Sequence, residues 1–301
     1  LQDSYIDSAS MEKDNTLVIK QVSQIKGPLF GVNYMQPVQV NYYLSPYDPN
    51  QNFEPTISDA DDKTGFFEVA PQLSENSGDT LIYATKFDHK KPIEFSISAN
   101  TPSEYVEAVR DGILYWNKAF GREVIRAKIA PEGASAPDYR HNIVQWINWD
   151  DAGYAYADAQ MDPRTGEILH AQVFLTSVFA FAGKERAKKL LRRLSLKGQK
   201  EQEKPSFLSM AGFQKKPLCH FDHQSRLTQT LNTVIHHPEI DDQKILKISQ
   251  DYVREVVAHE VGHTLGLRHN FAGSLATNIP LSTRKHIFEQ YMKTGDTPTG
   301  I

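Results

Sequence analysis

The residues best suited to chemistry lie within residues 257–269, which read VAHEVGHTLGLRH and contain the pattern H-E-x-x-H-x-x-G-x-x-H. In a helix, His259 and His263 lie one turn apart on the same face, which suits two nitrogen ligands of one zinc ion. Gly266 can adopt a positive φ and end the helix, so the chain can turn back and deliver His269 as a third ligand. Three protein ligands leave one coordination position open, which is typical of a catalytic zinc site.

Glu260 directly follows the first histidine, which places a carboxylate beside the metal without making it a ligand. Zinc lowers the pKa of a bound water to ~7, so Glu260 is expected to accept the water's proton as general base and return it to a leaving amine. The chemistry predicted from these residue types is hydrolysis of a peptide bond. Glu289 is an alternative third ligand, but the spacing through the glycine favours His269.

These residues need a helix to position them, and the preceding sequence predicts one. Pro238 and the acidic residues after it suit a helix N-terminus, where a missing amide donor is tolerated and carboxylates favour the helix dipole. Apolar residues then recur at helical spacing: Ile245, Ile248, Tyr252, Val256, Val257, Val261 and Leu265.

Residues 255–271, EVVAHEVGHTLGLRHNF, are similar to the metzincin clan of zinc endopeptidases and resemble more narrowly the bacterial Met-zincin family of zinc-dependent metalloproteases. The resemblance implies a zincin-like catalytic domain, in which a mixed twisted sheet is backed by the active-site helix. It implies Zn²⁺ as cofactor, with Glu260 as the base. It also implies an antiparallel strand along the rim of the cleft.

Metzincins carry a methionine-containing turn beneath the zinc, downstream of the third histidine. Met292 is the only methionine after His269, and its neighbours do not match that turn. We therefore expect the catalytic domain in this chain to be truncated before the turn, which puts the activity of this fragment in question but not that of a longer parent protein.

Composition sets broad limits. A length of 301 residues suggests about two domains. The net charge of −4 argues against a nucleic-acid-binding protein, and the single cysteine, Cys219, excludes an intrachain disulfide. No apolar run reaches the ~18 residues of a transmembrane span. We expect a secreted or periplasmic protein whose export signal is not in this chain.

The fold class predicted is α+β. Residues 1–90 contain short runs rich in β-branched and aromatic residues, at 16–22, 38–44, 66–70 and 80–86, and predict an antiparallel N-terminal β domain. Lys90-Lys91-Pro92 then reads as a boundary. The second domain, residues 91–301, is the expected catalytic domain.

The second domain begins with a predicted strand at 92–99 and a helix from Thr101, as N-cap, to Phe120. Further strands are predicted at 123–130, 142–149, 154–160 and 168–175. By the resemblance, Ile168–Thr176 is the candidate edge strand that binds an extended protein or peptide substrate by β-augmentation. The alternative is that it is a core strand.

Other groups could bind metal, but simpler explanations are favoured. The acidic side chains around residues 158–167 suit a turn as well as a calcium loop, and those at 59–62 suit a solvated loop. The cluster at 219–223 lacks the paired spacing of a structural zinc site; a separate hypothesis is that the Cys219 thiolate caps the catalytic zinc in a latent form. The residues concerned are Asp158, Asp162 and Glu167; Asp59, Asp61 and Asp62; and Cys219, His220, Asp222 and His223.

Three functions follow from these patterns. The leading one is a zinc-dependent endopeptidase. The second is a catalytically silent zincin-like binding module, against which the intact Glu260 argues. The third is an adaptor that acts through the basic helix predicted around residues 184–204. Such a helix is more often a solvated one that covers a sheet.

Overall fold

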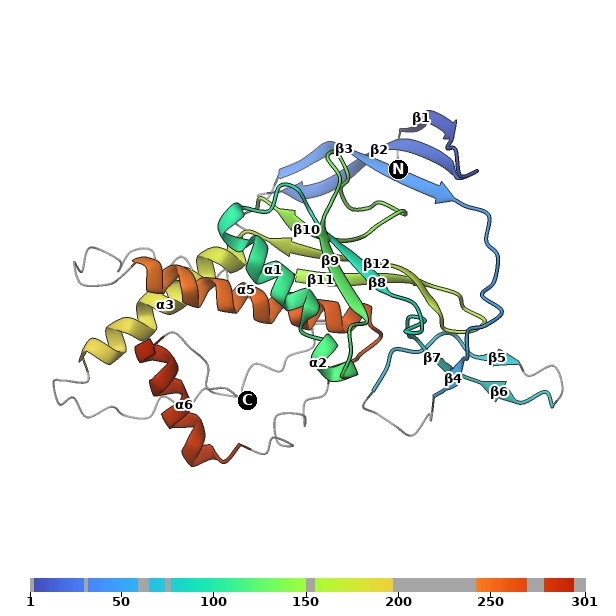
Figure 1. The fold of residues 1–301 in the computed structure, drawn as a ribbon. Coiled ribbons are helices and arrows are strands. Elements are labelled where there is room, and N and C mark those ends of the chain that lie inside the picture. The colour runs from blue at the N-terminus through green and yellow to red at the C-terminus, as the bar shows by residue number, and fades with distance from the viewer. Residues whose placement is uncertain are drawn as a thin grey trace. The chain divides into compact units, whose positions relative to one another are not determined.

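The computed structural model describes residues 3–29, 32–58, 65–73, 77–149, 155–196, 242–269 and 279–294 (Figure 1). The chain forms two compact units, Leu1–Phe53 and Glu54–Ile301. The domain boundary predicted from the sequence lay near Pro92 instead. Residues 54–90 therefore group with the second unit in the structure.

The first unit is a three-stranded antiparallel sheet in the order β1-β2-β3. Its strands are β1 (Ser4–Met11), β2 (Leu17–Leu29) and β3 (Val32–Leu44). β2 and β3 pair along their whole lengths, from Leu17 opposite Leu44 to Leu29 opposite Val32. The predicted antiparallel character of this region is confirmed, and its strands are longer than the short runs recognised in the sequence.

The second unit is built on a five-stranded mixed sheet in the order β11-β12-β10-β8-β9. Four strands run parallel, and β11 is antiparallel to β12. Their bounds are β8 (Ile93–Ile97), β9 (Ile125–Ile129), β10 (Asn142–Ile147), β11 (Ala155–Met161) and β12 (Ile168–Thr176). The mixed sheet expected for this region is confirmed.

The sheet order corrects the predicted edge strand. β12 lies between β11 and β10 and is hydrogen-bonded to both, so Ile168–Thr176 is an interior strand. The antiparallel strand at that end of the sheet is β11. The prediction came from the family resemblance rather than from the strand itself. β12 is buried at most of its positions, as an interior strand is, whereas β11 is buried only at its first residue.

Helices cover the sheet (Figure 1). α1 (Ser103–Leu114) and α3 (Val178–Leu196) both pack against the long helix α5 (Asp242–Thr264), which also contacts β11 and β12. α1 approaches α5 closely at Gly112, where an added Cβ would lie 2.8 Å from the Cβ of Val257. A short α2 (Asn117–Phe120) follows α1, and α6 (Leu281–Thr294) follows α5 in the chain.

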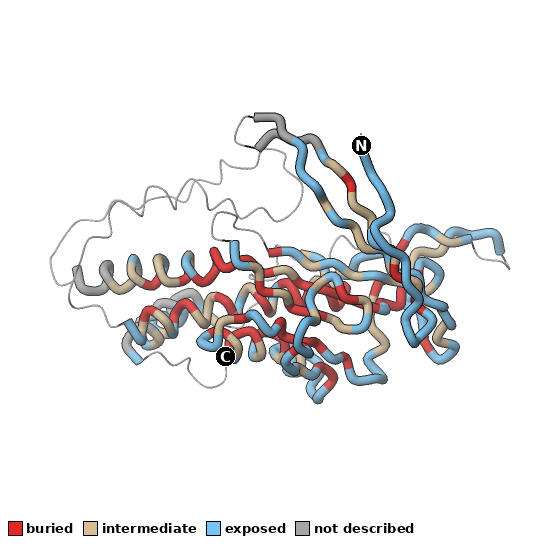
Figure 2. Tube along the Cα trace, turned by 90° about the horizontal axis from the view of Figure 1, so that it is seen from above, coloured by how far each residue is buried: buried red, intermediate tan, exposed pale blue. Residues whose placement is uncertain are grey.

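The inner face of α5 anchors it in the core. Val253, Val257 and Val261 recur every fourth residue and are fully buried. Each buried valine side chain contributes about 1.5–3 kcal/mol relative to an exposed one. Figure 2 shows buried residues running through the second unit, whereas β1 is exposed along its whole length. Because the valine face is held in the core, the side chains on the opposite face of α5 point away from the core.

Two local predictions need correction. The helix predicted from Thr101 begins at Ser103, and its N-terminal position, Pro102, makes no side-chain cap. Thr101 instead contacts Ser98, with 3.1 Å between their hydroxyl oxygens. Residues 66–70, predicted as a strand, contribute isolated bridges.

In the described part of the chain, no helix is long and apolar enough to cross a membrane.

The remaining strands of the second unit are short. β4 (Thr56–Ile57) pairs with β7 (Tyr83–Ala84), and β5 (Gln72–Leu73) pairs with β6 (Thr80–Leu81). Phe66 bridges to Leu267, just beyond the end of α5. The segment around Phe66 therefore forms part of its backbone pairing with residues next to the candidate site.

Candidate metal centre

The C-terminal end of α5 presents His259 and His263 on the face opposite its buried valines. The helix then ends in a Schellman motif: the amide of Leu267 donates to the carbonyl of Gly262 (3.1 Å), and the amide of Gly266 to that of His263 (2.9 Å). Gly266 has φ +95°, as expected for the glycine of such a motif. The turn brings His269 back over the helix.

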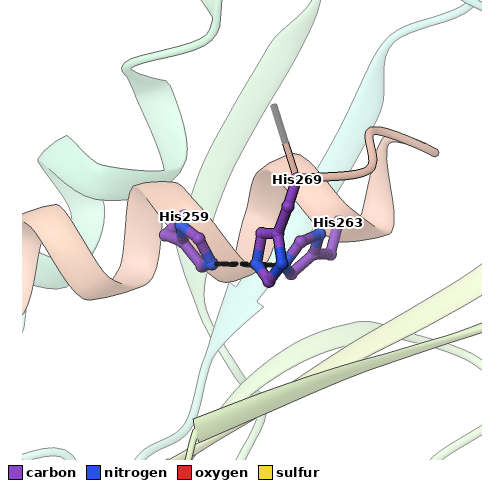
Figure 3. Close-up of side chains that lie close together, drawn as sticks. All are labelled: His259, His263 and His269. Atoms are coloured by element: carbon purple, nitrogen blue, oxygen red, sulfur yellow. Dashed lines mark hydrogen bonds between the residues drawn. The ribbon is translucent and has the colours of Figure 1, made fainter. Parts of the chain in front are cut away.

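The three histidine rings converge on one another (Figure 3). The Nε2 atom of His259 lies 3.1 Å from that of His263 and 3.0 Å from that of His269, and the third separation is 3.1 Å. Two nitrogens bound tetrahedrally to one zinc at ~2.0–2.1 Å would be ~3.3–3.4 Å apart. The separations in the structure are close to that value, so this donor set fits a zinc ion.

Hydrogen bonding alone does not account for this arrangement. The Nδ1 atom of His263 lies 2.8 Å from the carbonyl oxygen of Leu267, which can only accept, so the proton of the neutral ring belongs on Nδ1. Its Nε2 atom then carries a lone pair that faces the other two rings. This tautomer is the one that a metal ligand requires.

The protein disfavours protonation of His259 and His269. Desolvation by surrounding protein atoms, with smaller contributions from His263 and His269, lowers the pKa of His259 to about 4, even though much of its surface is exposed. The pKa of His269 is also lowered, first by burial and then by His263. The His259 and His269 rings are therefore neutral near pH 7, with lone pairs available for coordination.

Glu260 is 5% exposed. Burial raises the pKa of its carboxyl to about 7. A carboxyl group with a pKa near neutral pH can exchange a proton readily under those conditions. The structure thus places Glu260 beside the first histidine in the chain and in a buried setting, and its role as general base stays a prediction.

Trp116 supports the helix between the ligands, a contact that the sequence did not reveal. Its indole Nε1 donates to the carbonyl of Ala258 (2.8 Å). Its ring lies so close to Gly262 that an added Cβ there would be 2.5 Å from a ring atom. The glycine inside the H-E-x-x-H pattern therefore makes room for this tryptophan.

The turn after α5 is held by a segment from early in the second unit. The amide of Phe67 donates to the carbonyl of Gly266 (2.6 Å), and the amide of Arg268 donates to the carbonyl of Gly65 (2.7 Å). Sequence reasoning missed this pairing, because residues 66–70 were assigned to a separate N-terminal domain. Nothing in their local pattern signals a distant partner.

A cavity of about 770 Å³ adjoins the triad. It reaches His259 and is lined by residues of α3, α5, α6 and the α1–α2 junction, with more apolar than polar surface. A hydrogen bond from the Tyr291 hydroxyl to the Asp251 carboxylate links α6 to α5 at this cavity. Its apolar lining includes Trp116, Tyr252, Ile287 and Phe288.

The sequence around the triad matches one known protein family. Residues 241–291, which include the whole triad, match the family model described as Met-zincin. The match supports a metzincin-like zinc metalloprotease family. The Met-zincin resemblance seen in the sequence is thereby confirmed, and the family implies zinc as the metal for the three histidines. Searches of curated proteins and of solved structures found no match.

The other candidate metal-binding groups form no such cluster among the described residues. Among the described residues, His259, His263 and His269 form the one cluster of metal-ligating side chains. Glu289, the alternative third ligand, is not part of it. Asp162 pairs with Arg164 at 3.1 Å within its turn, as the turn interpretation expects. The groups at 59–62 and 219–223 lie outside the described residues.

The predicted basic helix corresponds in part to α3. Several of its described cations have partners within the chain: Lys188 pairs with Glu185 at 3.0 Å, and Arg186 lies over the ring of Tyr252 at 5.4 Å. Residues 197–204 lie outside the described part. Adaptor function through this surface stays a hypothesis.

Proposed function

We propose that this protein is a zinc-dependent endopeptidase. The observation that carries the proposal is the convergence of three histidine nitrogens at 3.0–3.1 Å, at the end of a helix that also carries a buried glutamate. The Met-zincin match over residues 241–291 supports the same reaction class.

The residues divide the work as follows. His259, His263 and His269 would hold the metal, and a bound zinc ion would supply Lewis acidity near neutral pH. Glu260 accepts the proton that the attacking water gives up. It then delivers that proton to the amine that leaves when the peptide bond breaks.

An extended peptide is proposed to bind along β11 rather than along Ile168–Thr176. β11 is the antiparallel strand at one end of the sheet. Among the described strands it pairs with β12 alone, so its outer edge is the proposed site of β-augmentation. β11 also packs against α5, the helix that carries the triad. The cavity beside His259 is of a size that accepts a ligand group, and its apolar lining favours a bulky apolar substrate side chain.

Glu260→Gln tests the proposal. The variant should keep the zinc content of the wild type and lose at least about 100-fold in cleavage of casein or a quenched fluorescent peptide, because the amide cannot accept a proton. His259→Ala is the matched control, and it should lose zinc as well as cleavage.

Two results would contradict the assignment. If Glu260→Gln cleaves as fast as the wild type, another group is the base. If the wild type binds zinc stoichiometrically and its Glu260 is intact but no peptide is cleaved, the catalytically silent binding module is the better description.

A further inference from the structure

We propose that Gly65 and Phe67 form part of the metal centre: their backbone groups hold the ligand-bearing turn, and the Phe67 ring orients His263. This inference rests on the proposed zinc function, and it adds a positioning role for a segment far from the histidines in the sequence. Phe67 is a positioning residue rather than a catalytic one, because it contacts a ligand and not the reacting atoms.

The backbone contacts form a clamp on the turn. The amide of Phe67 donates to Gly266, the amide of Arg268 donates to Gly65, and Phe66 and Leu267 form an antiparallel bridge between them. The carbonyl of Leu267 is also the group that faces the Nδ1 atom of His263. Holding Leu267 in place therefore holds the proton on the nitrogen that does not face the metal.

The clamp is itself anchored to the sheet. On its other side, the carbonyl of Phe67 accepts a hydrogen bond from the amide of Thr85 (2.7 Å). The neighbouring Lys86 exchanges backbone hydrogen bonds with the start of β12: its amide donates to Gly166 (3.0 Å), and its carbonyl accepts from Ile168 (2.8 Å). A continuous set of hydrogen bonds thus connects the central sheet to the turn.

The turn also packs closely against the backbone of Thr85. A Cβ added to Gly266 would lie 2.0 Å from the carbonyl oxygen of Thr85. Thr85 is 1% exposed. The turn therefore rests on buried backbone and cannot shift toward it, which leaves the position of His269 well determined.

The Phe67 side chain acts on a ligand directly. Its ring centroid lies 5.9 Å from that of His263, with the planes inclined at 58°, within the range of favourable aromatic pairs. Phe67 is 39% exposed, so burial in a core does not explain its position. With Leu267 on one side and Phe67 on another, the His263 ring has little freedom to rotate away from the metal position.

Phe66 is a matched control. It is 43% exposed, similar to its neighbour, and its backbone takes part in the same bridge. Successive side chains of an extended segment point to opposite sides, so the Phe66 ring faces away from the side on which Phe67 meets His263.

The test compares Phe67→Ala, Phe66→Ala and Phe67→Tyr in the full chain. Zinc affinity is measured by competition with a chromogenic chelator, and the site geometry by the visible absorption of the Co²⁺-substituted protein. Phe67→Ala should weaken zinc binding by about 10–100-fold, as loss of a group that supports a ligand does, and should alter the Co²⁺ spectrum. Phe66→Ala and Phe67→Tyr should bind zinc within about threefold of the wild type, because the former leaves the ring contact intact and the latter restores an aromatic ring.

Circular dichroism of the metal-free variants checks that each is folded. If Phe67→Ala has wild-type affinity and spectrum, the positioning role is overturned. Equal losses in Phe66→Ala and Phe67→Ala would overturn the role of the ring, because general weakening of the segment would then explain both. A wild-type protein without affinity for zinc would overturn the proposed function itself, and this inference with it.

Discussion

Residues 3–53 and residues 54–90 both consist of β-forming runs separated by turns, but they pair in different ways. The first set forms a sheet of its own, in which β2 and β3 match along their full lengths. The second set forms strands of two residues, and some of its other backbone groups pair with the turn after α5 and with the start of β12. Long runs can satisfy their hydrogen bonds with sequence neighbours, whereas short ones depend on distant partners.

The second set also contributes to the metal centre. The described backbone partners of the metal turn come from residues 65–67, within the second set. The N-terminal sheet is therefore expected to be dispensable for the metal centre, and residues 54–90 are expected to be required.

Removal of whole segments should produce the largest effect. A protein that begins at Lys91 should retain little or no zinc after dialysis, because the turn loses its clamp. A protein that begins at Glu54 should retain about one zinc per chain. Zinc per chain is measured by atomic emission spectrometry. Zinc loss from both shortened proteins would remove the distinction between the two regions.

Gly266→Ala should have the next largest effect. The substituted residue would have φ +95° and a Cβ 2.0 Å from the Thr85 carbonyl oxygen, so the turn must move. We expect the free energy of unfolding to fall by about 3 kcal/mol and zinc affinity to fall with it. Urea unfolding and chelator competition measure the two quantities.

Gly78→Ala separates strain from collision. Gly78 also lies in residues 54–90 and has φ +71°, but an added Cβ would meet nothing within 4 Å. Its expected cost is about 1–2 kcal/mol, from the left-handed conformation alone, with unchanged zinc affinity. Equal losses of zinc affinity in both variants would mean that contact with Thr85 is not what holds the turn.

Val18→Ala in β2 should have the smallest effect on the site. Val18 is buried, so its truncation should lower the stability of the N-terminal sheet by about 1–2 kcal/mol. Zinc affinity and peptide cleavage should stay within about twofold of the wild type. A clear loss of zinc affinity would show that the two units are energetically coupled.

Much of the second unit follows from local patterns. The predicted strands near residues 125, 143 and 168 correspond to β9, β10 and β12, because short runs rich in apolar and β-branched residues, bounded by turn residues, mark strands in the sequence. The order of those strands could not be predicted in the same way. Ile168–Thr176 was placed at an edge and lies inside the sheet, since pairing order depends on contacts between segments far apart in the chain.

The candidate site divides in the same manner. The spacing of His259, His263 and His269 was enough to predict that three nitrogens would meet. The three residues lie close together in the chain, and the geometry between them is set by one helical turn and one glycine. Whether they bind zinc stays a prediction. Residues 65–67 and Trp116 reach the site across long stretches of sequence, and only packing and backbone pairing in the folded chain bring them there. Such contacts leave no local period or spacing, so the tertiary structure alone reveals them.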